Sequence, residues 1–126
     1  MKYQELEIKY NFKARISGGV GEGWVPILDR LFGDLTSLGW DQEKMPVAQI
    51  KEKFGELRVY LDEQKIDHES ERAFLKSVED RLGQAATESY TVCQHCGEPG
   101  KLRGGRWLRV LCDDCDRKYL AGERWR

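Results

Sequence analysis

The chain has 126 residues, of which 34% are charged, and its 21 basic side chains nearly balance its 22 acidic ones. This length can bury a real apolar core in one domain, or in one domain with a small module attached. A net charge of −1 excludes the strongly basic composition with which many proteins bind nucleic acids or membranes. The sequence has neither an apolar run near the ~20 residues of a membrane helix nor a signal-peptide pattern, so we expect a cytoplasmic protein.

The first stretch to show a pattern is residues 3–16, where apolar and polar side chains alternate. Leu6, Ile8 and Phe12 fall on one parity, and charged or polar residues fall on the other. Period two over this length predicts a long strand with one solvated face. Residues 17–23 are rich in glycine and predict a turn or flexible loop, because their spacing is not that of a dinucleotide-binding loop.

Two helices and a hairpin are predicted next. A helix starts near Trp24 to Pro26 and stops near Gly39, since apolar residues recur at intervals of three and four. Residues 47–62 read as a hairpin, with Ile50 and Phe54 on its apolar parity and a turn near Gly55. A second helix is predicted over residues 67–88, with Asp67 as a candidate N-cap. The apolar residues expected to line the first helix are Ile27, Leu28, Leu31, Phe32, Leu35 and Leu38.

This order of elements predicts an α+β fold. The N-terminal strand and the hairpin would form a small, mostly antiparallel sheet, and two helices would pack on one of its faces. The composition changes around Tyr90, where residues become basic on balance and the cysteines begin. We therefore predict an α+β layer domain over residues 1–89 and a metal-binding module with a basic C-terminal tail over residues 90–126.

The chemistry of this module lies in four cysteines, spaced Cys93-x₂-Cys96-x₁₅-Cys112-x₂-Cys115. A CxxC turn directs two sulfurs at one point, and two such turns joined by a short hairpin complete a tetrahedron around a metal ion. Gly97 eases the first turn, and strands near 101–103 and 107–111 can supply the hairpin. The pattern predicts one structural Zn²⁺ in a module resembling a zinc ribbon or a treble-clef zinc finger.

Other readings of the cysteines are weaker. Disulfides are unusual in cytoplasm, and a redox-silent metal suits such a hairpin better than iron. A catalytic zinc is disfavoured because four thiolates leave no open position for water. His95, inside the first CxxC turn, could replace a cysteine as ligand, although a solvent-facing position is the simpler interpretation. Once bound, Zn²⁺ with four thiolates carries −2, so the surplus arginines can offset the charge of the cluster.

Three motifs resemble those of a family of small proteins encoded in bacteriophage and bacterial genomes. They are residues 21–28 (GEGWVPIL), residues 47–60 (VAQIKEKFGELRVY) and the Cys93-x₂-Cys96-Gly-Glu-Pro-Gly segment followed by Trp107-x₄-Cys112. The resemblance covers most of residues 20–115 and implies a bacterial or phage cytoplasmic setting. Val20 and Phe32 stand where that family has cysteines, which implies that the metal site uses the four C-terminal ones.

Two functional classes follow from these observations. The first is a non-enzymatic protein that binds another protein, for example a phage accessory factor or an inhibitor of a host protein. Trp and Arg are enriched at interface hot spots, and the C-terminal tail carries Arg124, Trp125 and Arg126. The aromatic residues are more numerous than a core requires, although Trp24 and Trp107 are expected inside it.

The alternative is a nucleic-acid-binding protein that uses the basic zinc module. Arg106 and Arg109 lie on the predicted hairpin of that module, and Lys51, Lys53 and Arg58 lie on the wet side of the first hairpin. An enzyme is the least favoured class. Glu22 and Glu52 are candidate acid–base groups, but no nucleophile with a partnering histidine is visible in the sequence.

Overall fold

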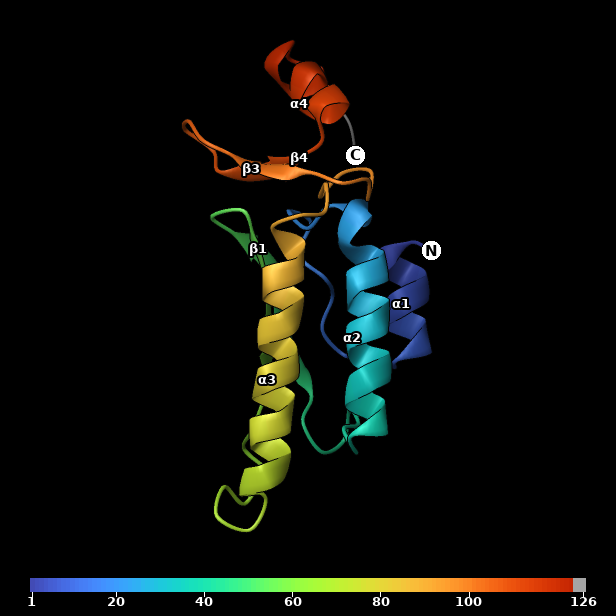
Figure 1. Ribbon diagram of the computed structural model, residues 1–126. Coiled ribbons are helices and arrows are strands. Elements are labelled where there is room, and N and C mark those ends of the chain that lie inside the picture. Colours follow the sequence, from blue (N-terminus) through green and yellow to red (C-terminus); the bar gives the residue numbers. More distant parts are fainter. Residues whose placement is uncertain (124–126) are drawn as a thin grey trace.

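The computed structural model describes residues 1–123 and orders them into helices and two small antiparallel sheets, so the α+β class is confirmed. In chain order the elements are α1 (Tyr3–Lys9), the 3-10 helix η1 (Glu22–Trp24), α2 (Val25–Ser37), β1 (Val47–Lys53), β2 (Glu56–Leu61), α3 (Arg72–Ser89), β3 (Lys101–Arg103), β4 (Arg109–Leu111) and α4 (Asp113–Leu120). Figure 1 shows α1, α2 and α3 side by side, with the β1–β2 hairpin behind α3 and the β3–β4 hairpin and α4 at one end. Among the described residues, no helix is long and apolar enough to cross a bilayer.

The strand predicted over residues 3–16 is wrong, because the segment begins with α1. Tyr3, Leu6 and Tyr10 are spaced for one helical face, and Leu6 is fully buried while Ile8 is 80% exposed. The helix ends in a Schellman-type cap, in which Phe12 N donates to Glu7 O at 2.9 Å. Asn11 takes the left-handed φ of 57° that this cap requires. The expected three-stranded sheet is therefore absent from the described residues, which form two separate two-stranded sheets.

The two long helices agree with the sequence pattern. Gly39 terminates α2 in the predicted place, since Trp40 N donates to Leu35 O at 2.9 Å across it. Leu38 was expected on the buried stripe but is exposed. Asp67 lies in a turn before α3, where it accepts a bond from Glu69 N at 3.1 Å, so it does not cap the helix itself.

The first hairpin is confirmed over β1 and β2, and its register decides which side chains face the helices. Val47 and Ile50 are buried in β1 because a bulge between Val47 and Gln49 adds one residue, and Leu57 is buried in β2. The main core also includes Trp24, whose Nε1 donates to Val92 O at 2.9 Å. The division at residue 89 remains a prediction.

The turn between β1 and β2 is unusual in its first residue. A two-residue hairpin loop favours a type I′ turn, which needs positive φ at both central positions and normally takes Asn-Gly or Asp-Gly. Here Phe54 has a φ of 56° and Gly55 a φ of 80°. The prediction that Phe54 lies on the buried face is wrong, since the residue is 62% exposed. A bulky side chain thus occupies a left-handed position that costs roughly 1–2 kcal/mol and receives no core packing in return.

Replacing Phe54 with asparagine should therefore stabilise the protein. Asparagine tolerates the left-handed region, so Phe54→Asn is expected to raise the free energy of unfolding by about 1 kcal/mol and the Tm by roughly 3–6 °C. Thermal and urea denaturation of the full chain measure this change. Phe54→Ala is the control, because it removes the ring without supplying a residue suited to the turn. A lower Tm for Phe54→Asn than for the parent would show that the ring contributes to the fold.

Candidate metal centre

The four cysteines predicted as ligands converge in space. The sulfur atoms of Cys93, Cys96, Cys112 and Cys115 all lie within 4.8 Å of one another, and each residue carries a free thiol. Cys96 Sγ and Cys112 Sγ are 3.7 Å apart. A tetrahedron with metal–sulfur distances of ~2.3 Å has edges of roughly 3.8 Å, whereas a disulfide needs about 2.05 Å. The group is therefore spaced to hold one metal ion.

The first pair of ligands lies in a tight turn after α3. Cys93 N donates to Glu98 O at 2.7 Å, and Gly97 N donates to Cys93 O at 2.9 Å. The turn reverses at Gly97, whose φ is 83°. Cys93 is buried and Cys96 is exposed, so the site lies near the surface with one wall open to solvent. His95 is half-buried and does not belong to the cluster of ligand atoms found among the described residues.

The second pair lies at the start of α4. Cys112 is the N-cap of this helix, and its sulfur accepts a hydrogen bond from Cys115 N at 3.4 Å. The strands β3 and β4 lead from one pair to the other, with Lys101 opposite Leu111 and Arg103 opposite Arg109. The ligands thus come from a turn, the end of a hairpin and the first turn of a helix.

The surroundings of the sulfurs shift the pKa values of the thiols in opposite directions. Burial alone would raise the pKa of Cys93, but amide hydrogen bonds from Cys96, Cys112 and His95 outweigh it and lower that pKa to about 7. Burial raises the pKa of the Cys96 and Cys115 thiols. Several negative sulfurs cannot share so small a volume without a cation, so metal binding would displace the remaining protons.

The glycine-rich segment before α2 packs directly against the first cysteine turn. Gly23 N donates to Gln94 O at 3.1 Å. A Cβ added to Gly23 would lie 2.2 Å from Cys93 O, and one added to Gly21 would lie 1.7 Å from Gln94 O. These two glycines are therefore sites of close backbone approach. Sequence reasoning assigned the segment to a flexible loop and missed this role, although the Gly-x-Gly spacing was the available signal.

Gln94 completes the connection between the cysteine turn, the hairpin and the glycine segment. Its side chain is buried, and its Oε1 accepts a hydrogen bond from Val110 N at 2.9 Å. Its backbone N donates to Val110 O at 2.9 Å as well. Val110 belongs to the main apolar core, so the metal turn is continuous with the body of the protein.

A buried ionic network lies behind the metal site, between the hairpin and α4. Arg109 is 6% exposed, and its Nε donates to Asp116 Oδ1 at 2.9 Å. Its guanidinium also lies 4.4 Å from the ring centroid of Tyr119. Arg103 Nη1 donates to Asp116 Oδ2 at 3.2 Å and its Nη2 donates to Asp113 Oδ1 at 2.7 Å. Arg103 and Arg109 thus bind within the module itself.

These positions change the set of residues expected to bind a partner. Arg109 is corrected to a buried structural residue, because Asp116 and two backbone oxygens engage its guanidinium. Arg106 is exposed on the loop between β3 and β4. The remaining predicted residues, Arg124, Trp125 and Arg126, lie outside the described residues. Lys51, Lys53 and Arg58 lie together on the β1–β2 hairpin.

Comparison with protein-family models, with curated proteins and with solved structures finds no match, so the interpretation of this site rests on its geometry.

Substitution of Gly23 should weaken the contact between the metal turn and the body. In Gly23→Ala the new methyl group would collide with the Cys93 carbonyl, and we expect a loss of about 2–3 kcal/mol in the free energy of unfolding. Gly83→Ala is the matched control. Gly83 is an exposed helical position in α3 where a Cβ would meet nothing within 4 Å, so alanine should stabilise by about 0.5–1 kcal/mol. Equal effects from the two substitutions in urea denaturation would contradict the proposed contact.

Substitutions of Arg109 and Arg106, both in the second hairpin, should have very different effects on stability. Arg109→Leu leaves the Asp116 carboxylate buried with only Arg103 beside it, so we expect a loss of about 2–4 kcal/mol and weaker metal retention. Arg106→Ala removes an exposed charge and should change stability by less than about 0.5 kcal/mol. Chemical denaturation and titration with a zinc chelator measure both quantities. If Arg106→Ala proved as damaging as Arg109→Leu, the network would not be what supports the module.

Proposed function

We propose that this protein is a non-enzymatic binding protein whose C-terminal module is organised by one structural zinc ion. The observation that carries the proposal is the cluster of four free thiols within 4.8 Å. Sulfur-only tetrahedral sites in proteins hold Zn²⁺ or iron, and Zn²⁺ suits a site with a purely structural task because it has no redox chemistry. Four thiolates would fill the coordination shell, which supports a structural rather than a catalytic metal.

The arrangement of the ligands supports a treble-clef-like module more than a zinc ribbon. The second pair of cysteines comes from the N-cap and first turn of α4 rather than from a second hairpin turn. In such a module the metal joins a turn, a hairpin and a helix that share little apolar contact. Among the described residues, the apolar cluster around the four sulfurs contains Leu111 and Tyr119 besides the cysteines, and Trp107 adds a ring contact with Tyr119. Folding of the module would therefore depend on the metal.

The metal would also support the surface that binds the partner. Leu102 of β3 approaches the β1–β2 turn so closely that a Cβ on Gly55 would lie 2.6 Å from its Cδ1. Figure 1 shows this turn beside the β3–β4 hairpin. Four described basic residues remain candidates for partner binding. Lys51, Lys53 and Arg58 lie on the strands that lead to this turn, and Arg106 is exposed on the loop between β3 and β4. In the bacterial or phage setting that the resemblance implies, the protein would act as an accessory factor through this surface.

Metal content and its consequence for folding test the proposal. Native mass spectrometry should find one Zn²⁺ per chain, and Cys96→Ser or Cys115→Ser should abolish stoichiometric binding. His95→Asn is the matched control, since it lies in the same turn outside the sulfur cluster and should retain the metal. Iron in place of zinc would refute the assignment of the ion, and a metal-free chain with disulfides would refute the site.

Removal of the metal should have a graded effect along the chain. A chelator is expected to accelerate amide hydrogen exchange most in β3, β4 and α4, because their shared core is small. A smaller increase is expected around Trp24, whose indole binds Val92 O, and the least in the middle of α3. Uniform exchange along the whole chain after chelation would mean that residues 1–89 do not hold a fold of their own.

A further inference from the structure

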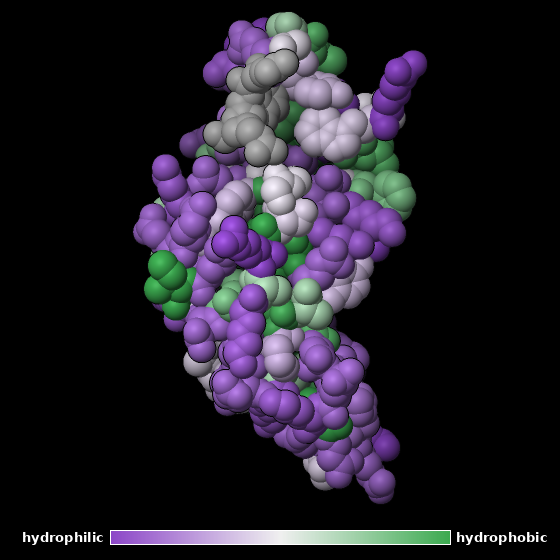
Figure 2. Space-filling model, turned by 180° about the vertical axis from the view of Figure 1, so that it is seen from behind, coloured by the Kyte–Doolittle hydropathy of each residue, from purple (hydrophilic) through white to green (hydrophobic). Residues whose placement is uncertain are grey.

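The outer face of the β1–β2 hairpin is the side of this sheet that turns away from α3. Residues directly opposite each other in an antiparallel pair share a face, and so do alternate residues along a strand. The inner face contains Ile50 and Leu57, which are buried. The outer face consists of the opposed pairs Gln49–Tyr60, Lys51–Arg58 and Lys53–Glu56. Figure 2, seen from behind, shows a mostly hydrophilic surface on this side, with a small group of hydrophobic side chains at the edge where the two hairpins meet.

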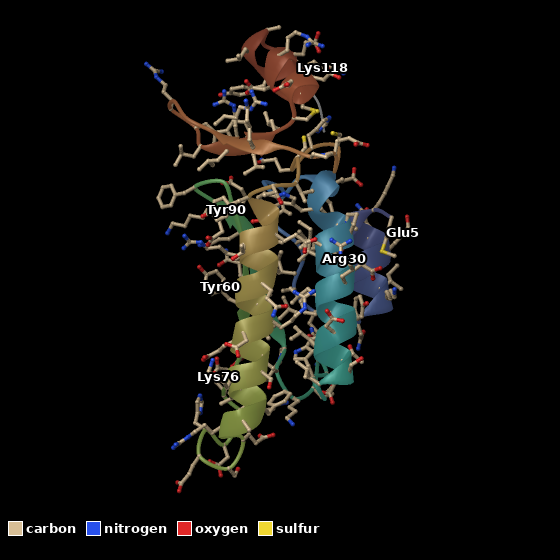
Figure 3. All side chains as sticks on the ribbon, in the orientation of Figure 1. Glu5, Arg30, Tyr60, Lys76, Tyr90 and Lys118 are labelled. Carbon is tan, nitrogen blue, oxygen red and sulfur yellow. The ribbon has the colours of Figure 1, made fainter. Side chains whose placement is uncertain are left out.

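The charge of this face is positive although the chain as a whole is not. Lys51, Lys53 and Arg58 stand against one carboxylate, three positive charges against one negative, so the balance of this face is +2. That carboxylate is paired within the protein: Glu56 Oε1 accepts from Arg58 Nε at 3.0 Å and its Oε2 accepts from Tyr90 Oη at 2.8 Å. Figure 3 shows Tyr60 and Tyr90 on the hairpin side of the molecule. The face therefore complements an anionic partner.

Each end of the face carries an exposed aromatic ring with a lysine beside it. Lys51 Nζ lies 5.4 Å from the ring centroid of Tyr60, and Lys53 Nζ lies 5.5 Å from that of Phe54. Both rings are more than one-third exposed. Five residue steps along the strand, from Tyr60 to Gly55, separate them by roughly 17 Å.

Phe54 is the residue whose presence the fold does not explain. It holds the left-handed position of the turn at a cost in stability, and its ring contributes nothing to the core. Leu102 and Leu108 both lie against Gly55, the next residue in the turn, and both are exposed. Strain retained at an exposed aromatic residue is typical of a binding site.

We propose that the outer face of β1–β2, with Phe54 at its end, binds single-stranded nucleic acid, with bases stacking on Phe54 and Tyr60 and phosphates contacting Lys51, Lys53 and Arg58. This inference rests on the proposed function, because it names the partner of a binding surface that the zinc module supports. Stacking on an open ring together with phosphate contacts is the common mode of sequence-tolerant single-strand binding. A duplex hides the faces of its bases, so it cannot use the two rings in this way.

A protein partner fits the same face less well. Protein interfaces have a continuous apolar centre with charges at the rim. Here the cations lie between the two rings, and each ring is accompanied by an ammonium group. A single strand can stack two separated bases on these rings while its intervening phosphates contact the cations.

Fluorescence anisotropy with labelled dT₁₂ and U₁₂, using the full zinc-loaded chain, tests the proposal. Contacts to three phosphates predict a slope of log affinity against log salt of about −2, which is a roughly 20-fold loss between 50 and 200 mM salt. Lys51→Ala with Lys53→Ala should reduce the slope to about −0.7. Lys65→Ala with Lys76→Ala is the control, because it removes the same charge from exposed positions outside the outer face and should leave the slope unchanged.

The Phe54→Asn variant distinguishes a role of Phe54 in binding from a role in folding. The variant should bind the oligonucleotides at least fivefold more weakly, as expected for the loss of one stacking contact, while its Tm rises. A purely structural phenylalanine would not produce both changes. Binding that is unchanged in Phe54→Asn, or equal affinity for a duplex of the same length, would overturn the proposal.

Two further outcomes separate this inference from the proposed function. Zinc is quantified on the same samples, so a zinc-loaded chain that binds neither oligonucleotide overturns the inference and leaves the metal site standing. A photoreactive phenylalanine at position 54 then identifies the class of partner in a bacterial lysate. Cross-links to protein that survive nuclease, without cross-linked nucleic acid, would assign the face to a protein partner and overturn the inference.

Discussion

The convergence of four sulfurs is the constraint on which the C-terminal module depends most, because the apolar cluster beside it is small. Its local apolar cluster consists of Cys93, Cys115 and Leu111, with Cys112 and Tyr119 packed against it. So small a cluster cannot offset the conformational entropy lost when about 30 residues become ordered. The ion pairs of Arg103 and Arg109 with Asp116 give the module a defined shape, but their own desolvation makes them a weak source of net stability. A metal ion bound by the four sulfurs would supply the missing free energy where turn, hairpin and helix meet.

The first cysteine turn, residues 93–97, contacts the rest of the molecule through its backbone. Gly23 and Gly21 lie so close to the cysteine turn that no side chain fits between them, and Trp24, next in sequence, is fully buried and bound to Val92 O. The metal turn therefore helps to fix the start of α2. On the other side, Leu102 rests on Gly55 and positions the turn of the first hairpin. Two segments far apart in sequence, the glycine segment and the β1–β2 turn, thus depend on the same module for their placement.

Local sequence patterns predicted much of this structure, and the errors arose where contacts between distant residues determine the structure. The cysteine spacing, the hairpin at 47–62 and the stop at Gly39 are encoded within a few residues, so each could be read from the sequence. The N-terminal segment was mispredicted as a strand because Leu6 and Tyr10 fit both a period of two and one face of a helix. In the structure the segment is helical and ends in the cap at Asn11. The burial of Arg109 depends on Asp116 and Tyr119, which another element supplies, so its charge suggested a surface role. The close approach at Gly23 likewise involves residues some 70 positions away.

The position of Phe54 shows where stability and binding compete. Every other feature of the first hairpin agrees with its fold: the register, the buried Ile50 and Leu57, and Gly55 in the turn. Phe54 alone opposes it, in a backbone conformation that asparagine would adopt at lower cost. Phe54 thus lowers stability without a contact in the core, and the folded chain by itself gives no physical reason for a bulky ring at this turn. Leu102 of β3 lies against Gly55 on the other side of this turn, so the C-terminal module borders the strained position directly.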